Sequence, residues 1–89
     1  MNKTEKKTWQ VYIIEASDGR LYTGITTDID RRWQQHLSGK GGARFFRGRK
    51  PRALVYTEQQ PDRSAASKRE AAIKSLSREE KRLLIESLI

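Results

Sequence analysis

The chain has 89 residues, of which 35% are hydrophobic, and its 19 basic and 11 acidic side chains give a net charge of +8. This length suffices for one domain with one small core. The absence of cysteine excludes a disulfide framework and a thiolate zinc site. No apolar run approaches membrane-spanning length, and the first residues, MNKTEKKT, lack the apolar stretch of a signal peptide. We therefore expect a soluble cytoplasmic protein, with nucleoid association left open, a disordered tail at 1–8 and a single domain at 9–89.

Two strands are predicted first, at 10–16 (QVYIIEA) and at 20–25 (RLYTGI), because both segments are rich in β-branched and aromatic residues. The Ser-Asp-Gly segment between them is a turn signal. A two-residue Asp-Gly loop would put Tyr12 and Tyr22 on opposite faces of the hairpin. A three-residue loop with a left-handed glycine would pair Ile14 with Tyr22 and place both tyrosines on one face. We prefer the second register, partly because the chemistry argued below requires it.

A helix is predicted directly after this hairpin. Thr26 or Thr27 is expected to cap its N-terminus, and Asp28 and Asp30 are favourable near its positive end. Apolar residues at four-residue spacing form the expected buried stripe of this helix: Ile29, Trp33 and Leu37.

Two adjacent arginines on this helix are not equivalent. Arg32 and His36, the only histidine of the chain, lie three and seven residues after Ile29 and therefore border the buried stripe. Arg31 projects away from the stripe toward water. We expect Arg32 and His36 to face the interior of the domain.

The excess positive charge is concentrated in one segment that contains no acidic residue. Its basic side chains are Arg31, Arg32, Lys40, Arg44, Arg47, Arg49, Lys50 and Arg52. The rest of the chain has as many basic as acidic residues. Such a block is typical of a protein that binds a phosphate backbone. The alternative is a basic loop that serves only solubility.

The second half of the chain is predicted to contain a loop, a strand and two helices. Residues 38–51 are glycine-rich and predict a mobile loop with room for one short helical turn. Phe45 and Phe46 are expected to anchor this loop to the core, with stacking of one of them on a base as the alternative. A third strand is expected at 52–58. A helix is expected at 63–76, after a break in regular structure at 59–62 that also supplies the N-cap of this helix. The helix has a small apolar face with Glu70 at its edge; the inward residues are Ala65, Ala66, Ala72, Ile73 and Leu76.

The last helix is predicted to begin at the capping box formed by Ser77 and Glu80. Its apolar positions are Leu83, Leu84, Leu88 and Ile89. The sequence contains no internal repeat and no signal for a second domain.

The groups able to do chemistry are few: Tyr12, Tyr22, Arg32, His36 and Glu70. One histidine cannot form a multi-histidine metal site, and no serine or cysteine lies in a recognisable nucleophile motif. The set suits phosphodiester hydrolysis, in which a carboxylate holds a hard cation. An arginine can stabilise the charge that develops on the phosphate oxygens, and a tyrosine or histidine can orient and deprotonate water.

Four stretches in order resemble the motifs of the GIY-YIG nuclease superfamily: QVY at 10–12, YTG at 22–24, DIDRRWQQH at 28–36 and KRE at 68–70. The similarity runs from about Gln10 to Leu76 and is strongest to the small stand-alone bacterial, YhbQ-like members, in stretches such as YTGITTD, GKGGA and KREAAIK. It implies an α+β fold with a three-stranded antiparallel sheet flanked by helices. It also implies a divalent-metal-dependent DNA endonuclease, which leaves 5′-phosphate and 3′-hydroxyl ends and can act in DNA repair or recombination.

The resemblance also implies roles at matching positions. Tyr12 would position or activate water, Tyr22 would lie near the nucleophile and the scissile phosphate, and Arg32 would stabilise the phosphate. His36 would transfer a proton or organise hydrogen bonds, and Glu70 would bind one Mg²⁺ or Mn²⁺ ion. The expected nucleic-acid contacts are Gly24, which would let the backbone turn closely beside the site, and Arg31, Lys40, Arg44, Arg47, Arg49 and Lys50.

The sequence departs from the family pattern in two places. Gln10 and Val11 stand where the first motif usually has glycine and isoleucine, and the only asparagine is Asn2, whereas many relatives have one late in the domain. These departures leave open an enzyme that is weak or that depends on a partner.

Other interpretations remain open at the level of sequence. Both tyrosines can be ordinary strand residues, His36 a partly buried edge residue and Glu70 the ion-pair partner of Lys74. Trp33 and Tyr56 are expected to be structural, and Arg69 has no assigned function. The whole chain can be a nucleic-acid-binding module without catalysis, or a domain whose basic loop meets an acidic protein. DNA, branched or damaged DNA included, is the expected partner, RNA stays an alternative, and no membrane partner is expected.

Overall fold

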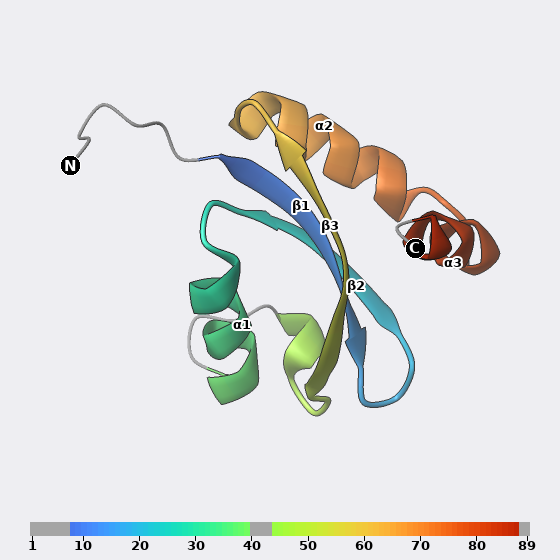
Figure 1. Cartoon of the computed structure of the whole chain (residues 1–89). Coiled ribbons are helices and arrows are strands. Elements are labelled where there is room, and N and C mark those ends of the chain that lie inside the picture. Colours follow the sequence, from blue (N-terminus) through green and yellow to red (C-terminus); the bar gives the residue numbers. More distant parts are fainter. Residues whose placement is uncertain (1–7, 40–43, 88–89) are drawn as a thin grey trace.

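The computed structural model describes residues 8–39 and 44–87. Within them lie β1 (Trp9–Ala16), β2 (Leu21–Thr26), α1 (Ile29–Ser38), the 3-10 turn η1 (Arg44–Phe46), β3 (Pro51–Gln60), α2 (Arg63–Lys74) and α3 (Arg78–Glu86). The strands form one antiparallel sheet in the order β2-β1-β3, so that β1 is central and β2 and β3 are edges. Helices cover both faces of this sheet (Figure 1). The predicted α+β class with a three-stranded antiparallel sheet is confirmed.

The hairpin has the register that places both tyrosines on one face. Ile14 pairs with Tyr22, and Tyr12 pairs with Gly24. The turn is closed by the Ala16 N–H, which donates to the Arg20 carbonyl at 2.8 Å, and Gly19 adopts a φ of +86° that glycine tolerates without strain. The three-residue loop is therefore confirmed.

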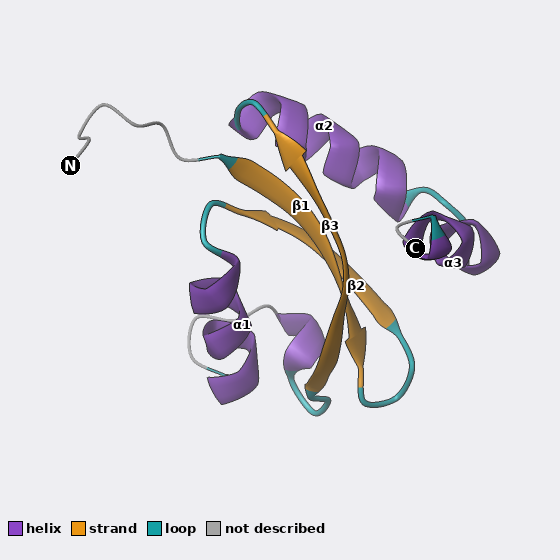
Figure 2. Ribbon diagram, viewed as in Figure 1, coloured by secondary structure: helices purple, strands orange, loops and turns teal. Residues whose placement is uncertain are grey.

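The alternating side chains of β1 divide the core into two parts. Val11 and Ile13 pack with Ala66 and Ile73 of α2, on the side that we call the α2 face. Tyr12 and Ile14 point the other way and pack with Phe46 of η1, with Ile29 and Trp33 of α1 beside them; we call this side the α1 face. Figure 2 shows the sheet between these two helical layers. Both faces of β1 are thus buried, as suits a central strand.

Two details of the first helix differ from the predictions. The N-cap is Asp28, whose Oδ1 accepts from the Arg31 N–H at 3.0 Å, and not Thr26 or Thr27. The Thr26 hydroxyl is used one step earlier, since it accepts from the Asp28 N–H at 3.0 Å and forms the turn before the helix. The buried stripe runs through Ile29, Trp33 and His36, while Leu37 is 49% exposed.

The second half of the chain follows the predictions with shifted ends. Strand β3 is longer than expected, because its last two glutamines pair with the start of β1. Helix α2 ends at Lys74, since Ser77 must take an extended backbone to cap α3, and its capping box with Glu80 is confirmed. Ala66 and Ile73 are fully buried as predicted, but Ala72 is exposed. Phe46 is buried and Phe45 half-buried, which confirms that they anchor the loop.

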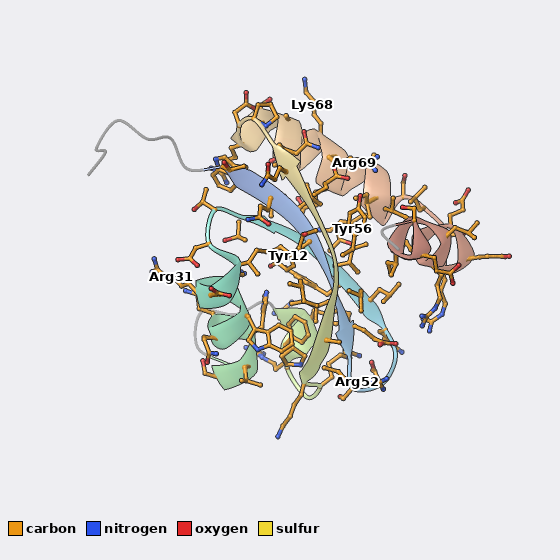
Figure 3. All side chains as sticks on the ribbon, in the orientation of Figure 1. Tyr12, Arg31, Arg52, Tyr56, Lys68 and Arg69 are labelled. Atoms are coloured by element: carbon orange, nitrogen blue, oxygen red, sulfur yellow. The ribbon has the colours of Figure 1, made fainter. Side chains whose placement is uncertain are left out.

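Arg69 and Tyr56 belong to a structural network on the α2 face. The Arg69 Nε donates to Glu58 of β3 at 2.8 Å, and the Tyr56 hydroxyl donates to the other oxygen of the same carboxylate. Figure 3 shows Arg69 and Tyr56 on the same side of the domain. This network ties α2 to β3 and gives Arg69 the structural explanation that the sequence lacked.

Predictions for residues 1–7, Lys40, Leu88 and Ile89 fall outside the described residues. Among the described helices, none combines the length and the apolar character that crossing a bilayer requires.

Candidate active site

A buried phenol and a buried imidazole form the centre of the candidate site. The Tyr12 hydroxyl lies 2.9 Å from Nε2 of His36, and the two side chains are 1% and 2% exposed. Tyr12 lies on the central strand β1, and His36 lies in the last turn of α1. Helix α1 packs over this part of the strand. Each polar group has the other as partner, and this pairing offsets the free energy that burying either alone would cost.

The second tyrosine extends this cluster toward the surface. The Tyr22 ring centroid lies 6.1 Å from that of Tyr12 and 5.2 Å from that of His36. On its other side the same ring packs against Phe45 and Phe46, at 5.3 and 5.2 Å. Tyr22 is only half-buried, so it is the tyrosine that a ligand can reach.

Gly24 creates the space into which the two tyrosine rings pack. A Cβ atom at this position would lie 2.6 Å from the Tyr12 hydroxyl oxygen and 3.0 Å from Cε2 of Tyr22. Real side chains do not tolerate contacts this short. The requirement for glycine here is therefore a close approach of side chains to the backbone, and not a left-handed conformation.

Arg32 brings a positive charge to the two phenols. Its Nη1 donates to Oε1 of Gln35 at 2.8 Å, one turn further along α1, and this contact fixes the side chain. Burial alone would lower the pKa of Arg32, but its interactions with Tyr12 and Tyr22 outweigh this effect and hold the pKa above its ordinary value. The guanidinium therefore stays charged, with both hydroxyl groups beside it.

The titration behaviour of the buried pair is set mainly by desolvation. Burial raises the pKa of Tyr12 to about 12, although the neighbouring Arg32 acts in the opposite direction. Burial and the Arg32 charge together lower the pKa of His36 to about 4. At neutral pH the centre thus contains a neutral phenol, a neutral imidazole and one cation. In this state Tyr12 can donate to an unprotonated Nε2 of His36.

Arg32 also lines an open cleft between the end of β2 and the start of α1. This cleft has a volume of about 280 Å³. The residues that line it are Trp9, Ile25, Thr26, Thr27, Asp28, Arg31, Arg32 and Gln35. Arg31 is exposed as predicted, and Figure 3 shows it projecting outward from the molecule. Arg32 thus belongs both to the tyrosine–histidine centre and to the lining of this cleft, where Arg31 lies beside it.

Glu70 lies on α2, which covers the face of the sheet opposite to α1. Its side chain is 23% exposed, and its carboxylate lies 3.3 Å from Nζ of Lys74. Arg69 turns toward β3, where it contacts Glu58, and a helix advances 100° per residue. Glu70 therefore points about 100° around α2 from the side that contacts β3. Among the described residues, the interaction found for Glu70 is its ion pair with Lys74, whereas Tyr22 lies on the α1 face of the sheet with Tyr12 and His36. The structure thus brings Tyr12, Tyr22, Arg32 and His36 together and, in the part of the chain that it describes, shows no contact between them and Glu70.

The predicted nucleic-acid contacts divide into two groups. Arg31, Arg44, Arg47 and Lys50 are exposed to solvent. Arg49 is instead fixed within the domain, because its Nε donates to Asp18 at 2.9 Å and its Nη1 donates to the Phe45 carbonyl at 2.7 Å. Arg52 lies 3.8 Å from Glu15. Two arginines of the acid-free block therefore form ion pairs with carboxylates that are distant in sequence, on β1 and on the turn that follows it.

Two supporting residues were not predicted from the sequence. Gln35, which holds Arg32, lies three residues after it on the same helix, and this spacing was a signal that could have been used. Asp18, which holds Arg49, is 31 residues away along the chain, and no local pattern indicates such a contact.

Comparison with known proteins assigns the chain to a family. Residues 8–83, which include all five candidate site residues, match the model of the GIY-YIG catalytic domain. A UPF0213 protein of Desulfotalea psychrophila is 53% identical over 96% of this chain and 77% of its own length. The UPF0213 protein YhbQ of Escherichia coli is 46% identical over 86% of this chain and 76% of its own length.

Solved structures agree with this assignment. The solution NMR structure of a UPF0213 protein from Bacillus halodurans, 47% identical, covers 89% of this chain and 83% of its own with a TM-score of 0.57. The solution NMR structure of a protein from E. faecalis, 36% identical, covers 94% and 88% with a TM-score of 0.65. The chain belongs to the GIY-YIG catalytic domain family, and within it to the UPF0213, YhbQ-like proteins.

Proposed function

We propose that this protein is a divalent-metal-dependent endonuclease that hydrolyses phosphodiester bonds in DNA. The family supports a nuclease function. The observation that carries the proposal is the grouping of Tyr12, Tyr22, Arg32 and His36 beside a cleft lined by two arginines. Such a grouping offers charge and hydrogen-bond donors to a phosphate at one point.

Arg32 and Tyr22 are the groups that would touch the substrate. Both are half-buried, so they are ordered by packing and still accessible. Arg32 would donate to the phosphate oxygens, on which negative charge grows as the pentacovalent transition state forms. The Tyr22 hydroxyl would orient the attacking water or donate to the same oxygens.

Tyr12 and His36 would act mainly by positioning. Protonating a group of pKa about 4 at pH 7 costs about 4 kcal/mol, at 1.4 kcal/mol per unit. His36 is therefore a poor final acceptor for a proton and a good hydrogen-bond acceptor for Tyr12. With its proton directed at His36, the Tyr12 oxygen keeps its lone pairs toward Arg32 and Tyr22, and it fixes the geometry of both.

Glu70 is the residue proposed to bind the metal ion. Within the described residues, no three His, Cys, Asp or Glu side chains form a cluster that could hold an ion. One carboxylate fits Mg²⁺ or Mn²⁺ all the same, because magnesium in phosphoryl-transfer sites is often held by one or two carboxylates together with substrate phosphates and water. The ion, when bound, supplies positive charge to the phosphate. Lys74 now occupies the carboxylate and would have to give way.

Cleavage assays with a matched pair of acidic variants test the proposal. Purified protein is incubated with supercoiled, branched and single-stranded DNA in Mg²⁺ or Mn²⁺, and the ends of any product are mapped. We expect Glu70→Gln and Arg32→Ala to lower kcat by about 10² or more, and chelation of the metal to abolish cleavage. Glu79→Gln, which removes an exposed carboxylate from α3, should cleave like the wild type. No cleavage by the wild type, or full activity of Glu70→Gln, would overturn the proposal.

The alternative is a module that binds nucleic acid without turnover. The Glu70–Lys74 ion pair favours it, because a carboxylate already neutralised by a lysine is less available to a cation. This alternative predicts salt-dependent DNA binding that survives Glu70→Gln and Tyr22→Phe, and no cleavage product from any of the DNA substrates.

A further inference from the structure

A second cleft lies at the edge of β2, outside the tyrosine–histidine centre. Its volume is about 220 Å³, below the size of pockets that enclose drug-sized molecules. It is lined by Arg20, Leu21, Phe45, Arg78 and Lys81. These residues come from the hairpin, from η1 and from the first turn of α3, so the cleft joins three segments distant in sequence. We call it the β2-edge cleft.

The β2-edge cleft is lined by cationic and apolar side chains. Three of its five lining residues are cationic, and the lining described contains no acidic side chain. Arg78 and Lys81 share one side of α3, since they are three residues apart, and Arg78 donates through Nη2 to the Gly19 carbonyl at 3.1 Å. The hairpin and α3 are thereby held together across the cleft.

The acidic residues nearest in sequence pair mainly with groups outside the cleft, and Asp18 is shared between Arg49 and the cleft residue Arg20. Asp18 lies 2.9 Å from Arg49 but 3.7 Å from Arg20, whose side chain is mostly exposed. Glu80 accepts from the Ser77 N–H within the capping box, and Glu15 pairs with Arg82 and Arg52. Glu79, exposed, lies 100° around α3 from Arg78. Of the three cations of the cleft, Arg20 is thus paired with Asp18, whereas no carboxylate among the described residues pairs with Arg78 or Lys81.

The β2-edge cleft is separated from the candidate active site by a single ring. Phe45 lines the cleft, and its centroid lies 5.3 Å from that of Tyr22. Arg49 lies over the Phe45 ring, 4.6 Å from its centroid, and Phe46 packs edge-on at 5.0 Å. Phe45 thus packs against Tyr22 of the candidate active site and also lines the β2-edge cleft.

We propose that the β2-edge cleft binds backbone phosphates of the DNA strand as that strand leaves the active site across Phe45. The inference rests on the proposed function, because it assumes that the scissile phosphate lies at Tyr22 and Arg32. Lys81 and Arg20 contact phosphate oxygens, and the sugar packs on Leu21 and Phe45. Contacts of this kind position the strand without reading its sequence.

The test compares two lysines that carry the same charge at different places. Lys81→Gln removes a charge from the cleft, whereas Lys68→Gln removes one from the outer side of α2, where Figure 3 shows Lys68 pointing away from the domain. The affinity for a DNA duplex is measured as a function of salt, and KM and kcat are measured separately. Melting temperatures check that all variants are folded.

We expect Lys81→Gln to weaken binding several-fold and to lower the slope of log K against log salt by about 0.9, the value for one lost phosphate contact. Lys81→Glu should weaken it by more than tenfold, and Lys81→Arg should bind like the wild type. KM should rise with kcat unchanged, and Lys68→Gln should alter neither. Equal effects of Lys81→Gln and Lys68→Gln, or no DNA binding by the wild type, would overturn the inference.

The binding measurement separates this inference from the proposed function. If the wild type binds DNA but does not cleave it, a selective effect of Lys81 still supports the cleft while the nuclease proposal fails. If cleavage depends on Glu70 and Lys81→Gln behaves like Lys68→Gln, the cleft fails alone.

Discussion

The two faces of the sheet are built from the same strands and differ in the groups buried at their centres. On the α2 face, Val11, Ile13 and Ile73 are fully buried hydrocarbon. On the α1 face, the neighbouring residue Tyr12 is buried with His36, and both carry polar atoms. The period of two along β1 thus divides a layer that stabilises the domain from a layer that holds polar groups in a fixed geometry.

This comparison shows how a domain of this size can hold polar groups in a fixed arrangement. A buried polar pair adds little net stability, because the hydrogen bond mainly offsets the loss of water. The buried hydrocarbon of the α2 face must therefore provide most of the stability that the α1 face does not. Substitutions on the two faces should accordingly separate stability from activity.

Ile73→Ala should have the largest effect on stability. The side chain is fully buried between α2 and the sheet, and truncating such a residue lowers the free energy of unfolding by about 2–5 kcal/mol. Urea unfolding measures the loss, with Ile73→Val as a milder variant expected to lose about 1 kcal/mol. The kcat of the folded fraction should stay near that of the wild type.

The matched substitution on the other face is Tyr22→Phe, which should lower activity and leave the free energy of unfolding nearly unchanged. If Ile73→Val lowered kcat as much as Tyr22→Phe did, the assignment of stability to the α2 face and of activity to the α1 face would be wrong.

His36 should make the stability depend on pH in the acidic range. Its pKa is lowered to about 4 in the folded protein by burial and by Arg32, against about 6.5 unfolded. Between these values the unfolded chain binds a proton that the folded chain does not, so stability falls as the pH falls from 6.5 to 4, by about 3 kcal/mol in total. Below pH 4 both states are protonated and this contribution stops changing.

The measurement is direct, because His36 is the only histidine of the chain. An NMR titration of its ring protons gives the folded pKa without assignment by mutation, and urea unfolding at several pH values gives the slope. A folded pKa near 6.5 would show that the imidazole is not desolvated and that the α1 face is wetter than the structure indicates.

Gly24→Ala should disturb the α1 face from within. The new methyl group would lie 2.6 Å from the Tyr12 oxygen, and relieving such overpacking costs about 1–3 kcal/mol. Because the relief must come from moving the tyrosines, activity should fall together with stability. Pairing the change with Tyr12→Val removes the obstructing ring, so the double variant should be more stable than the sum of the two losses predicts. Strict additivity would contradict this mechanism.

The sequence predicted those parts of the site that depend on local rules. The Ser-Asp-Gly turn determines the register that aligns Tyr12 with Tyr22, and the helical period separates Arg32 from Arg31. Both were confirmed because turn chemistry and side-chain period act over a few residues.

The predictions that were wrong concern positions where groups distant in sequence compete for the core. Leu37 was expected inside and His36 at the border, since a leucine is ordinarily the better core residue. The order reversed because Tyr12 provides a buried hydrogen-bond partner for the imidazole, and Tyr22 and Phe46 provide rings against which it packs. The pairing of Arg49 with Asp18 was likewise invisible, because it exists only once η1 has docked against the hairpin.

The smallest effect on stability is expected at Thr23. Within the described residues, its Oγ1 is the one buried side-chain oxygen without a hydrogen-bond partner. Thr23 pairs with Ile13 across the hairpin and therefore faces α2, where it is 4% exposed. On this face a hydroxyl group has lost water and gained no partner, so Thr23→Val should raise the free energy of unfolding by up to about 1 kcal/mol. Tyr12→Phe removes a hydroxyl from the other face and should lower the free energy of unfolding instead, since the buried imidazole of His36 then loses its hydrogen bond to Tyr12. Urea unfolding of the two variants compares the signs of the two changes in the free energy of unfolding. A stabilising Tyr12→Phe or a destabilising Thr23→Val would contradict the difference that we infer between the buried hydroxyl groups of the two faces.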